Sequence, residues 1–134
     1  MPTQQSLISD ICNVAPVNYE WGAIKWLCND ELMPNCQQSF GYAYVLPGKI
    51  NPGHQHTTCQ EIIYMLAGEC DVDMNGERLH LKPGQTLLIP QGVEHVVTNN
   101  GWEPAVYVAS FSASFRGTVF TEESTSAQPT ECVY

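Results

Sequence analysis

The chain has 134 residues, a length that favours a single domain able to bury a core without disulfide support. Five Lys and Arg residues against fourteen Asp and Glu give a net charge of −9, so DNA or RNA would be repelled over most of the surface. Nucleic acid is therefore not an expected partner. The N-terminus lacks a basic start, and no segment approaches the ~18 apolar residues of a membrane helix. We expect a soluble, cytoplasmic protein with no membrane partner.

Residues 1–37 form a less regular N-terminal arm in the predicted organisation. Their one strongly apolar stretch is 21–28, which reads Trp-Gly-Ala-Ile-Lys-Trp-Leu-Cys. This stretch could add an edge strand to a sheet, or it could cover a neighbouring subunit. The sequence leaves both alternatives open.

Turn signals recur at short intervals along the middle of the chain, and runs rich in Val, Ile, Leu and Tyr lie between them. The signals are Pro47-Gly48, Asn51-Pro52-Gly53, Asn75-Gly76, Pro83-Gly84, Pro90-Gln91-Gly92 and Asn99-Asn100-Gly101. This pattern is typical of an antiparallel all-β sandwich or barrel, which we predict over residues 38–116. A polar tail covers 117–134, and its stretch 121–131 is expected to be poorly ordered unless a partner holds it.

The strand predicted over residues 40–46 places its even-numbered residues on one face and its odd-numbered residues on the other. The sequence does not decide which face looks into the barrel. If the even-numbered face does, Tyr42 or Tyr44 could hydrogen-bond a substrate oxygen or act as an acid. The alternative is that both tyrosines are core or interface aromatics.

Histidines and a glutamate follow this strand at spacings that suggest a metal site. His54 and His56 share a face on a β-strand but diverge on a helix, so a strand is required if both bind one ion. Glu61 lies an odd five residues after His56, which would place it on the opposite face of one continuous strand. The chain must therefore turn or bulge within residues 57–60. His95 follows the turn at 90–92, which can start a new strand aimed at the same point.

Residues 70–81 contain the clearest local unit, because Asn75-Gly76 predicts a two-residue hairpin turn. Counting outward from this turn, Asp73 pairs with Arg78 and Asp71 pairs with His80 on the solvent face. The inward face then holds the apolar residues Cys70, Val72, Leu79 and Leu81. His80 is therefore predicted to be a solvated cross-strand partner rather than a metal ligand.

Three imidazoles and one carboxylate make a ligand set that suits Fe, Ni, Cu, Co, Zn or Mn and disfavours Ca or Mg. Four protein ligands leave up to two octahedral positions open for water, substrate or dioxygen. We expect one divalent transition metal ion on His54, His56, Glu61 and His95. Glu94 should point away from the metal by strand alternation, as a carboxylate on the rim.

Six cysteines are an even number, but they lack C-x-x-C spacing. They are Cys12, Cys28, Cys36, Cys59, Cys70 and Cys132. We expect reduced thiols, most of them small buried hydrophobic side chains. Cys59 is the exception worth testing, because it lies two residues from Glu61.

The spacing of these residues resembles the two motifs of the cupin superfamily, in its small single-domain form of the cupin 2 type. The first motif is matched by Gly48, then after five residues His54-Gln55-His56, after four more Glu61, and after six more Gly68. The second motif is matched by Gly84, then after five residues Pro90-Gln91-Gly92, after two more His95, and after three more Asn99. The resemblance implies a conical, six-to-eight-stranded β-barrel of the jelly-roll, or double-stranded β-helix, type. It also implies metal ligands at His54, His56, Glu61 and His95, and a homodimer.

Three functions follow from this resemblance. The first is a dioxygenase-type oxidoreductase, in which a redox metal binds dioxygen and a small-molecule substrate. The second is a redox-neutral isomerase, lyase or decarboxylase that uses the metal as a Lewis acid and needs a nearby base. The third is a ligand- or metal-binding protein without turnover. Glu61, which some relatives leave as a base, joins Tyr42 and Tyr44 as a catalytic candidate, and fold alone does not separate the three.

Overall fold

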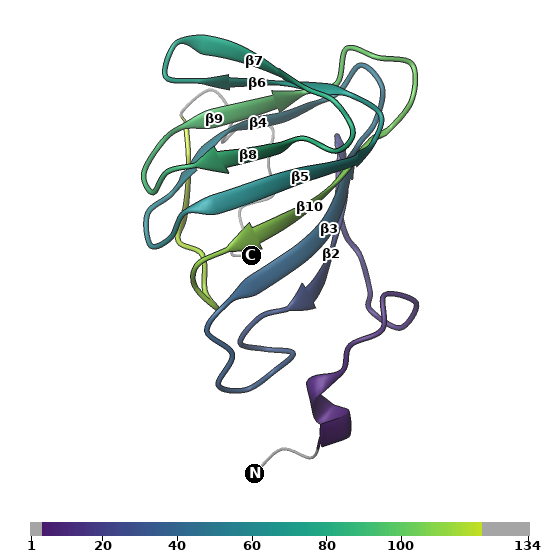
Figure 1. Cartoon of the computed structure of the whole chain (residues 1–134), viewed down its shortest axis with the longest axis vertical. Coiled ribbons are helices and arrows are strands. Elements are labelled where there is room, and N and C mark those ends of the chain that lie inside the picture. Colours follow the sequence, from purple (N-terminus) through teal and green to yellow (C-terminus); the bar gives the residue numbers. More distant parts are fainter. Residues whose placement is uncertain (1–3, 122–134) are drawn as a thin grey trace.

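The structure is a computed structural model that describes residues 4–121. Its elements are η1 (Gln4–Leu7), β1 (Val17–Tyr19), β2 (Gly22–Cys28), β3 (Ser39–Val45), β4 (Ile50–His56), β5 (Glu61–Ala67), β6 (Cys70–Met74), β7 (Glu77–Leu81), β8 (Thr86–Ile89), β9 (His95–Thr98), β10 (Ala105–Phe111) and β11 (Thr118–Phe120). Within the described part, the only helix is the four-residue 3₁₀ turn η1. The prediction of an all-β fold is confirmed (Figure 1). No described helix has the length and hydrophobicity needed to cross a membrane.

Two antiparallel sheets enclose the core. One has the strand order β1-β2-β3-β10-β5-β8, and the other has the order β11-β4-β9-β6-β7. Neighbouring strands are often far apart in sequence, as where β10 lies between β3 and β5, which is the jelly-roll type of connection (Figure 1). Apolar side chains from both sheets meet between them, among them Val45, Ile63, Val72 and Val97, which are all at most 1% exposed. This two-sheet barrel positions the candidate site.

Strand β3 shows which of its faces looks into the barrel. Ala43 and Val45 are buried in the core, whereas Tyr42 and Tyr44 lie on the opposite, partly exposed face. The inward face carries small residues because the space is tight. A Cβ at Gly41 would lie 2.9 Å from Cζ3 of Trp26 on β2. The odd-numbered face is therefore the inner one.

The hairpin of β6 and β7 has the predicted register. Asp71 pairs with His80 and Asp73 pairs with Arg78 across the two strands. Asn75 and Gly76 occupy the turn with φ of 54° and 76°, the left-handed conformation that a two-residue turn of this type requires. The Arg78 guanidinium donates two hydrogen bonds to Asp73, of 2.9 and 2.8 Å. The prediction that alternation separates core from solvent in this hairpin is confirmed.

Both ends of the barrel extend beyond the predicted range of 38–116. At the N-terminal side, β1 and β2 continue the six-stranded sheet, with β2 paired to β3. The apolar stretch of the N-terminal arm therefore adds strand β2 to this sheet. At the C-terminal side, β11 pairs with β4, so the second sheet reaches residue 120. The tail stretch expected to be poorly ordered lies outside the described residues, apart from its first residue.

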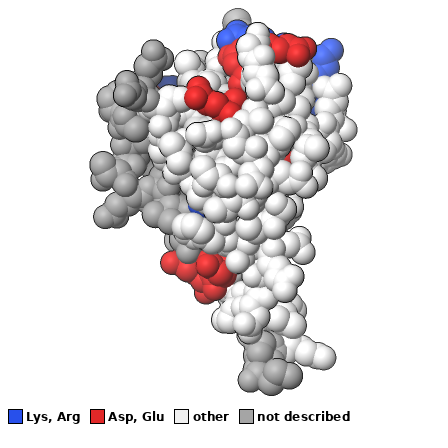
Figure 2. All heavy atoms as spheres, turned by 90° about the vertical axis from the view of Figure 1, so that its left-hand side faces the viewer, with Lys and Arg blue, Asp and Glu red and all other residues white. Residues whose placement is uncertain are grey.

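The surface reflects the acidic composition. On the face shown in Figure 2, Asp and Glu side chains gather at the end of the molecule formed by the β6–β7 hairpin and again lower down. Lys and Arg side chains show at a few points, most of them around the first group. Much of this face carries neither kind of charge.

Candidate metal centre

Four side chains from three strands converge between the two sheets. His54 and His56 come from β4, Glu61 begins β5 and His95 begins β9. One ligand atom from each lies within 4.8 Å of every other, which makes the four a candidate metal-binding site. The predicted turn is present, because β4 ends at His56 and residues 57–60 carry the chain from the five-stranded to the six-stranded sheet. That crossing brings the Glu61 carboxylate opposite the imidazoles.

Each imidazole is oriented through its Nδ1 atom. His54 Nδ1 lies 2.7 Å from the carbonyl oxygen of Pro52, and His95 Nδ1 lies 3.0 Å from that of Val93. His56 Nδ1 lies 3.3 Å from the Thr118 hydroxyl. A carbonyl can only accept, so Nδ1 of His54 and His95 carries the proton and Nε2 keeps its lone pair. This is the tautomer that binds metal through Nε2.

The centre contains buried polar atoms that lack hydrogen bonds. Glu61 Oε1 lies 3.2 Å from His56 Nε2 and 3.3 Å from His95 Nε2. Neither Glu61 Oε1 nor His56 Nε2 has a hydrogen-bond partner among the described residues, and both are buried. Buried polar atoms without partners are costly, and a cation between them would satisfy both. The residues present therefore fit a bound divalent metal ion.

The electrostatics favour the protonation states that a metal needs. Burial lowers the pKa of His54 to about 3, and the neighbouring His95 and His56 add to the shift. Burial alone would raise the pKa of Glu61, but contacts with His56 and His95 outweigh it and lower that pKa. The same carboxylate outweighs burial at His95 and raises its pKa. At neutral pH His54 is neutral and Glu61 is charged, and a proton on His95 is the competitor of the metal.

Two aromatic rings and one buried arginine pack next to the His56 side of the centre. The Phe111 ring lies edge-on to His56, with 5.0 Å between ring centroids. Arg116, only 5% exposed, places its guanidinium 3.9 Å from the Trp26 ring centre and 4.8 Å from that of Phe111. No sequence motif predicts this stack, because Arg116 is the last residue but one of a featureless stretch at 112–117.

Tyr107 is the inward-facing tyrosine of the site, and sequence reasoning missed it as well. It lies on β10, is 3% exposed and shares a hydrogen bond with Asn51. Burial raises its pKa above the usual range, and the Glu61 carboxylate adds to that shift. The alternation of small and large residues at Ala105, Tyr107, Ala109 and Phe111 was the signal that could have found it.

The other predicted neighbours of the site divide between the two faces. Ile63 and Met65 share the buried face of Glu61, and Glu94 is exposed beside His95, as expected. Tyr42 and Tyr44 face away from the core, so the condition for their catalytic role is not met. The correction follows from packing, because the inner face of β3 has room only for small side chains.

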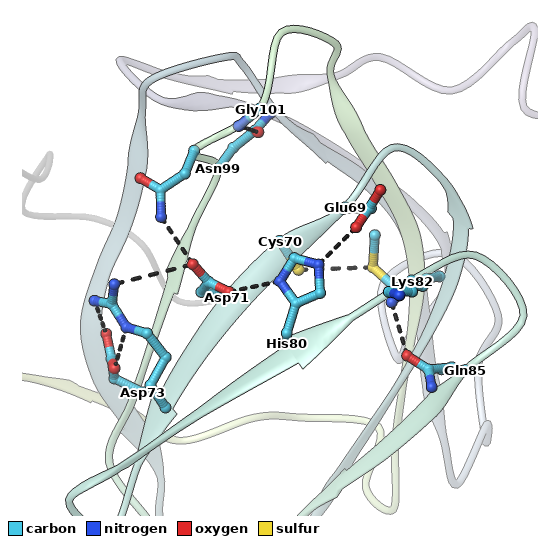
Figure 3. A network of polar contacts seen from close by, with 12 residues as sticks. Glu69, Cys70, Asp71, Asp73, His80, Lys82, Gln85, Asn99 and Gly101 are labelled. Carbon is cyan, nitrogen blue, oxygen red and sulfur yellow. Dashed lines mark hydrogen bonds and ion pairs between the residues drawn. The ribbon is translucent and has the colours of Figure 1, made fainter.

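His80 lies apart from the four ligands, in the polar network drawn in Figure 3. Its Nδ1 is 2.7 Å from Asp71 Oδ1 and its Nε2 is 2.6 Å from Glu69 Oε1. Asn100 donates a 2.8 Å hydrogen bond to the other oxygen of Asp71. These side chains line a surface pocket of about 370 Å³. The prediction that His80 is the cross-strand partner of Asp71 is confirmed.

Comparison with known proteins identifies the class to which this fold and site belong. The family model described as "Cupin domain" matches residues 41–111, just over half of the chain. The chain therefore belongs to the cupin family.

Individual relatives come from plants and bacteria. The rhicadhesin receptor of Pisum sativum is 38% identical over 78 residues, which cover 54% of this chain and 36% of the receptor. Protein SchB of Streptomyces halstedii is 32% identical over 101 residues, covering 75% of this chain and 73% of SchB. Polyketide synthase CurC of Streptomyces cyaneus is 27% identical over 112 residues, covering 84% of this chain and 73% of CurC. The chain spans only about a third to a half of the plant relatives it matches.

Solved structures agree on the fold. The oxalate decarboxylase of Lactobacillus farciminis superimposes with a TM-score of 0.77 at 20% identity, over 91% of this chain and 38% of that one. Peruvianin-I, from the latex of Thevetia peruviana, gives a TM-score of 0.79 at 20% identity, over 90% of this chain and 80% of Peruvianin-I. At this identity the likeness establishes the cupin barrel alone.

Proposed function

We propose that the chain is a metal-dependent cupin enzyme that acts on a small organic molecule, with dioxygenase-type oxidation as its reaction. One observation carries the proposal: three imidazoles and one carboxylate are preset around a single point inside the barrel. A redox-active divalent ion held there would supply open coordination positions for dioxygen and substrate. His54, His56, Glu61 and His95 would hold the ion.

The surrounding side chains prepare that point without taking part in proton transfer. The Pro52 and Val93 carbonyls hold two imidazoles in the binding tautomer, and Glu61 supplies the negative charge that offsets a divalent ion. Phe111 is buried against His56 and excludes water from that side of the centre. A dry site of this kind strengthens electrostatic interactions with a bound anion or oxygen species.

The protonation of nearby groups favours oxidation over a redox-neutral reaction. An isomerase, lyase or decarboxylase of this type needs a general acid or base that titrates near neutral pH. Burial raises the pKa of Tyr107 and of Cys59, so both keep their protons, and the lowered pKa of Glu61 makes it a weak base. Cys70 also interacts with Tyr107, and burial raises the pKa of its thiol to about 12, so it keeps its proton as well. Oxidation at the metal does not require such a group.

The test is oxygen uptake by protein purified without added metal, together with elemental analysis. The panel should contain small ketones, thiols and uronates, with polyketide-type carbonyl compounds added because CurC is a polyketide synthase by name. We expect iron, and substrate-dependent oxygen uptake that is lost in His54→Ala and kept in His80→Ala. Zinc with no uptake, and with isomerisation or loss of CO₂ instead, would overturn the dioxygenase. Binding without any turnover would favour a sensing or storage role.

Tyr107→Phe separates the two catalytic alternatives. If Tyr107 only packs against the centre, the variant keeps oxygen uptake within about twofold of wild type. If the reaction needs a proton from its hydroxyl, turnover falls by about 10²-fold or more while the metal content stays the same.

We also propose a homodimer that uses the outer face of the six-stranded sheet. Ile62 and Leu88 are register partners on β5 and β8, and with Tyr64 and Leu66 they are 40–50% exposed. A contiguous group of apolar side chains on a sheet face is typical of an interface. Light scattering on wild type and on Leu88→Lys tests this, with a monomeric wild type as the contradicting result. A cytoplasmic location stays a prediction.

A further inference from the structure

Two cysteines outside the metal centre lie close enough to bond. Cys28 is the last residue of β2, and Cys36 lies near the end of the connection to β3, eight residues later. Their Sγ atoms are 2.8 Å apart. A disulfide bond is about 2.05 Å long, so a small side-chain rotation separates the thiol pair from the bonded state. The contact therefore marks a site where a disulfide can form without rebuilding the chain.

The connection between these residues has a defined shape that holds the sulfurs together. Asn29 caps it, because its side-chain oxygen accepts hydrogen bonds from the backbone N–H of Glu31 and Leu32, at 3.1 and 2.9 Å. Backbone hydrogen bonds then run from Met33 N–H to the Asn29 carbonyl and from Cys36 N–H to the Met33 carbonyl. Two consecutive turns thus return the chain to the end of β2. The backbone of this loop therefore brings Cys36 next to Cys28.

The pair differs from the other described cysteines in access and in partners. Cys28 and Cys36 are half-buried, which lets a small reagent reach them, whereas Cys59 and Cys70 are buried. Cys12 is exposed, and its sulfur makes no hydrogen bond to another described residue. Burial and the neighbouring Cys36 thiol raise the pKa of Cys28 to about 11, so Cys36 is the thiol expected to react first.

The position of the pair connects it to the metal-bearing end of the barrel. Cys28 pairs with Phe40 on β3, the preceding residue Ser39 pairs with Phe111, and Phe111 pairs with Glu61 on β5. The β2–β3 connection therefore lies at the end of the six-stranded sheet where β10 ends (Figure 1). Two residues before Cys28, Trp26 packs against Phe111, the ring that contacts His56.

We propose that Cys28 and Cys36 are a thiol modification site that forms a reversible intramolecular disulfide by exchange with a low-molecular-weight disulfide. In the first step the Cys36 thiolate attacks one sulfur of the small disulfide, forms a mixed disulfide and releases one small thiol. In the second step Cys28 loses its proton and attacks Cys36 Sγ, which closes the loop and releases the second small thiol. The protein gives up two electrons and two protons, and the small disulfide is reduced to two thiols. The bond ties residues 29–35 to the end of β2.

The experiment treats the full chain with oxidised glutathione or with a reductant, alkylates the remaining thiols and digests the protein for mass spectrometry. We expect a linked peptide pair containing Cys28 and Cys36, the loss of two alkylated thiols per monomer, and a thermal midpoint raised by a few degrees over the reduced form. Adding reductant should reverse all three changes.

Three variants make the outcome decisive. Cys28→Ser should stop at the glutathione mixed disulfide on Cys36, whereas Cys36→Ser should react slowly at Cys28. The double variant Cys12→Ser/Cys132→Ser should oxidise like wild type, because the proposal involves neither residue. The proposal is overturned if Cys28 and Cys36 stay alkylatable in oxidised wild type, or if the linked pair contains any other cysteine. The wild-type result decides even if a serine variant fails to fold, and it is independent of the proposed oxidation reaction.

Discussion

His54 and His95 stand directly opposite each other in the register of β4 and β9, with their ring centroids 4.3 Å apart. Each ring is held in the same way, because Nδ1 lies within hydrogen-bond distance of the carbonyl two residues earlier, Pro52 for one and Val93 for the other. Strand pairing and backbone geometry therefore aim two of the four ligands. This half of the candidate metal centre is therefore placed by paired strands.

The hydroxyl of Thr118 is expected to tune metal affinity through His56. It is the group within reach of His56 Nδ1, at 3.3 Å, and it fixes the ring with Nε2 toward the centre. Thr118→Val keeps the shape and removes this contact, so affinity for a divalent metal should fall roughly 10-fold. Competition with a chromogenic chelator measures the change. Thr86→Val, at the exposed first residue of β8, is the matched control, and equal affinities in the two variants would refute the role of Thr118.

The amino-acid sequence was most informative where side-chain type and spacing act together. The register of Asp71 with His80 follows from one turn and strict alternation, and the structure has it. The set of His54, His56, Glu61 and His95 follows from motif spacing in the same way. Alternation alone did not decide which face of β3 is buried, because that depends on the room left by Trp26 on the neighbouring strand.

Contacts over long sequence separations were beyond the reach of local patterns. Thr118 belongs to a three-residue strand in a segment that the sequence assigns to the tail, yet it pairs with β4 and contacts His56. Arg116 meets the Trp26 ring only because the chain folds back toward β4 at this point. Neither position carries a periodic or motif signal, since the interaction is made by topology and not by neighbours in sequence.

Arg116 should contribute more to stability than an exposed arginine. Its guanidinium is buried over the rings of Trp26 and Phe111. Replacement by Met keeps an apolar chain of similar length but removes the charge, so the free energy of unfolding should fall by about 2 kcal/mol. Arg78→Met, at an exposed ion pair with Asp73, should cost less than about 1 kcal/mol. Urea unfolding of both variants tests the difference, and equal losses would contradict the account.

Two glycines with similar backbone angles should respond differently to substitution. Gly68 and Gly76 have φ of +67° and +76°, so alanine is strained at both. A Cβ at Gly68 would lie 2.2 Å from the carbonyl oxygen of Pro104, whereas one at Gly76 would meet open space. We expect Gly76→Ala to cost about 1 kcal/mol and Gly68→Ala about 3 kcal/mol or more. Thermal unfolding of the two variants decides, and a smaller loss for Gly68→Ala would show that the close approach is absent.

The His80 network predicts a pH-dependent contribution to stability. Hydrogen bonds to Asp71 and then Glu69 raise the pKa of His80 above its ordinary value of about 6.5. A raised pKa means that the stabilisation is fully present below the ordinary value and is lost as pH rises through the folded-state value. His80→Gln should therefore lose more stability relative to wild type at about pH 5.5 than at about pH 9. Denaturant titrations at the two pH values measure this, and an equal loss at both would exclude the charged network.

Metal stoichiometry decides whether one divalent metal ion binds at His54, His56, Glu61 and His95. Wild type, His54→Ala and His80→Ala should be purified in parallel, confirmed as folded by circular dichroism and compared by elemental analysis. We predict about one ion per chain in wild type and in His80→Ala, and a loss of most of it in His54→Ala, because three ligands remain. Unchanged stoichiometry in His54→Ala, or a loss in His80→Ala instead, would contradict the metal centre.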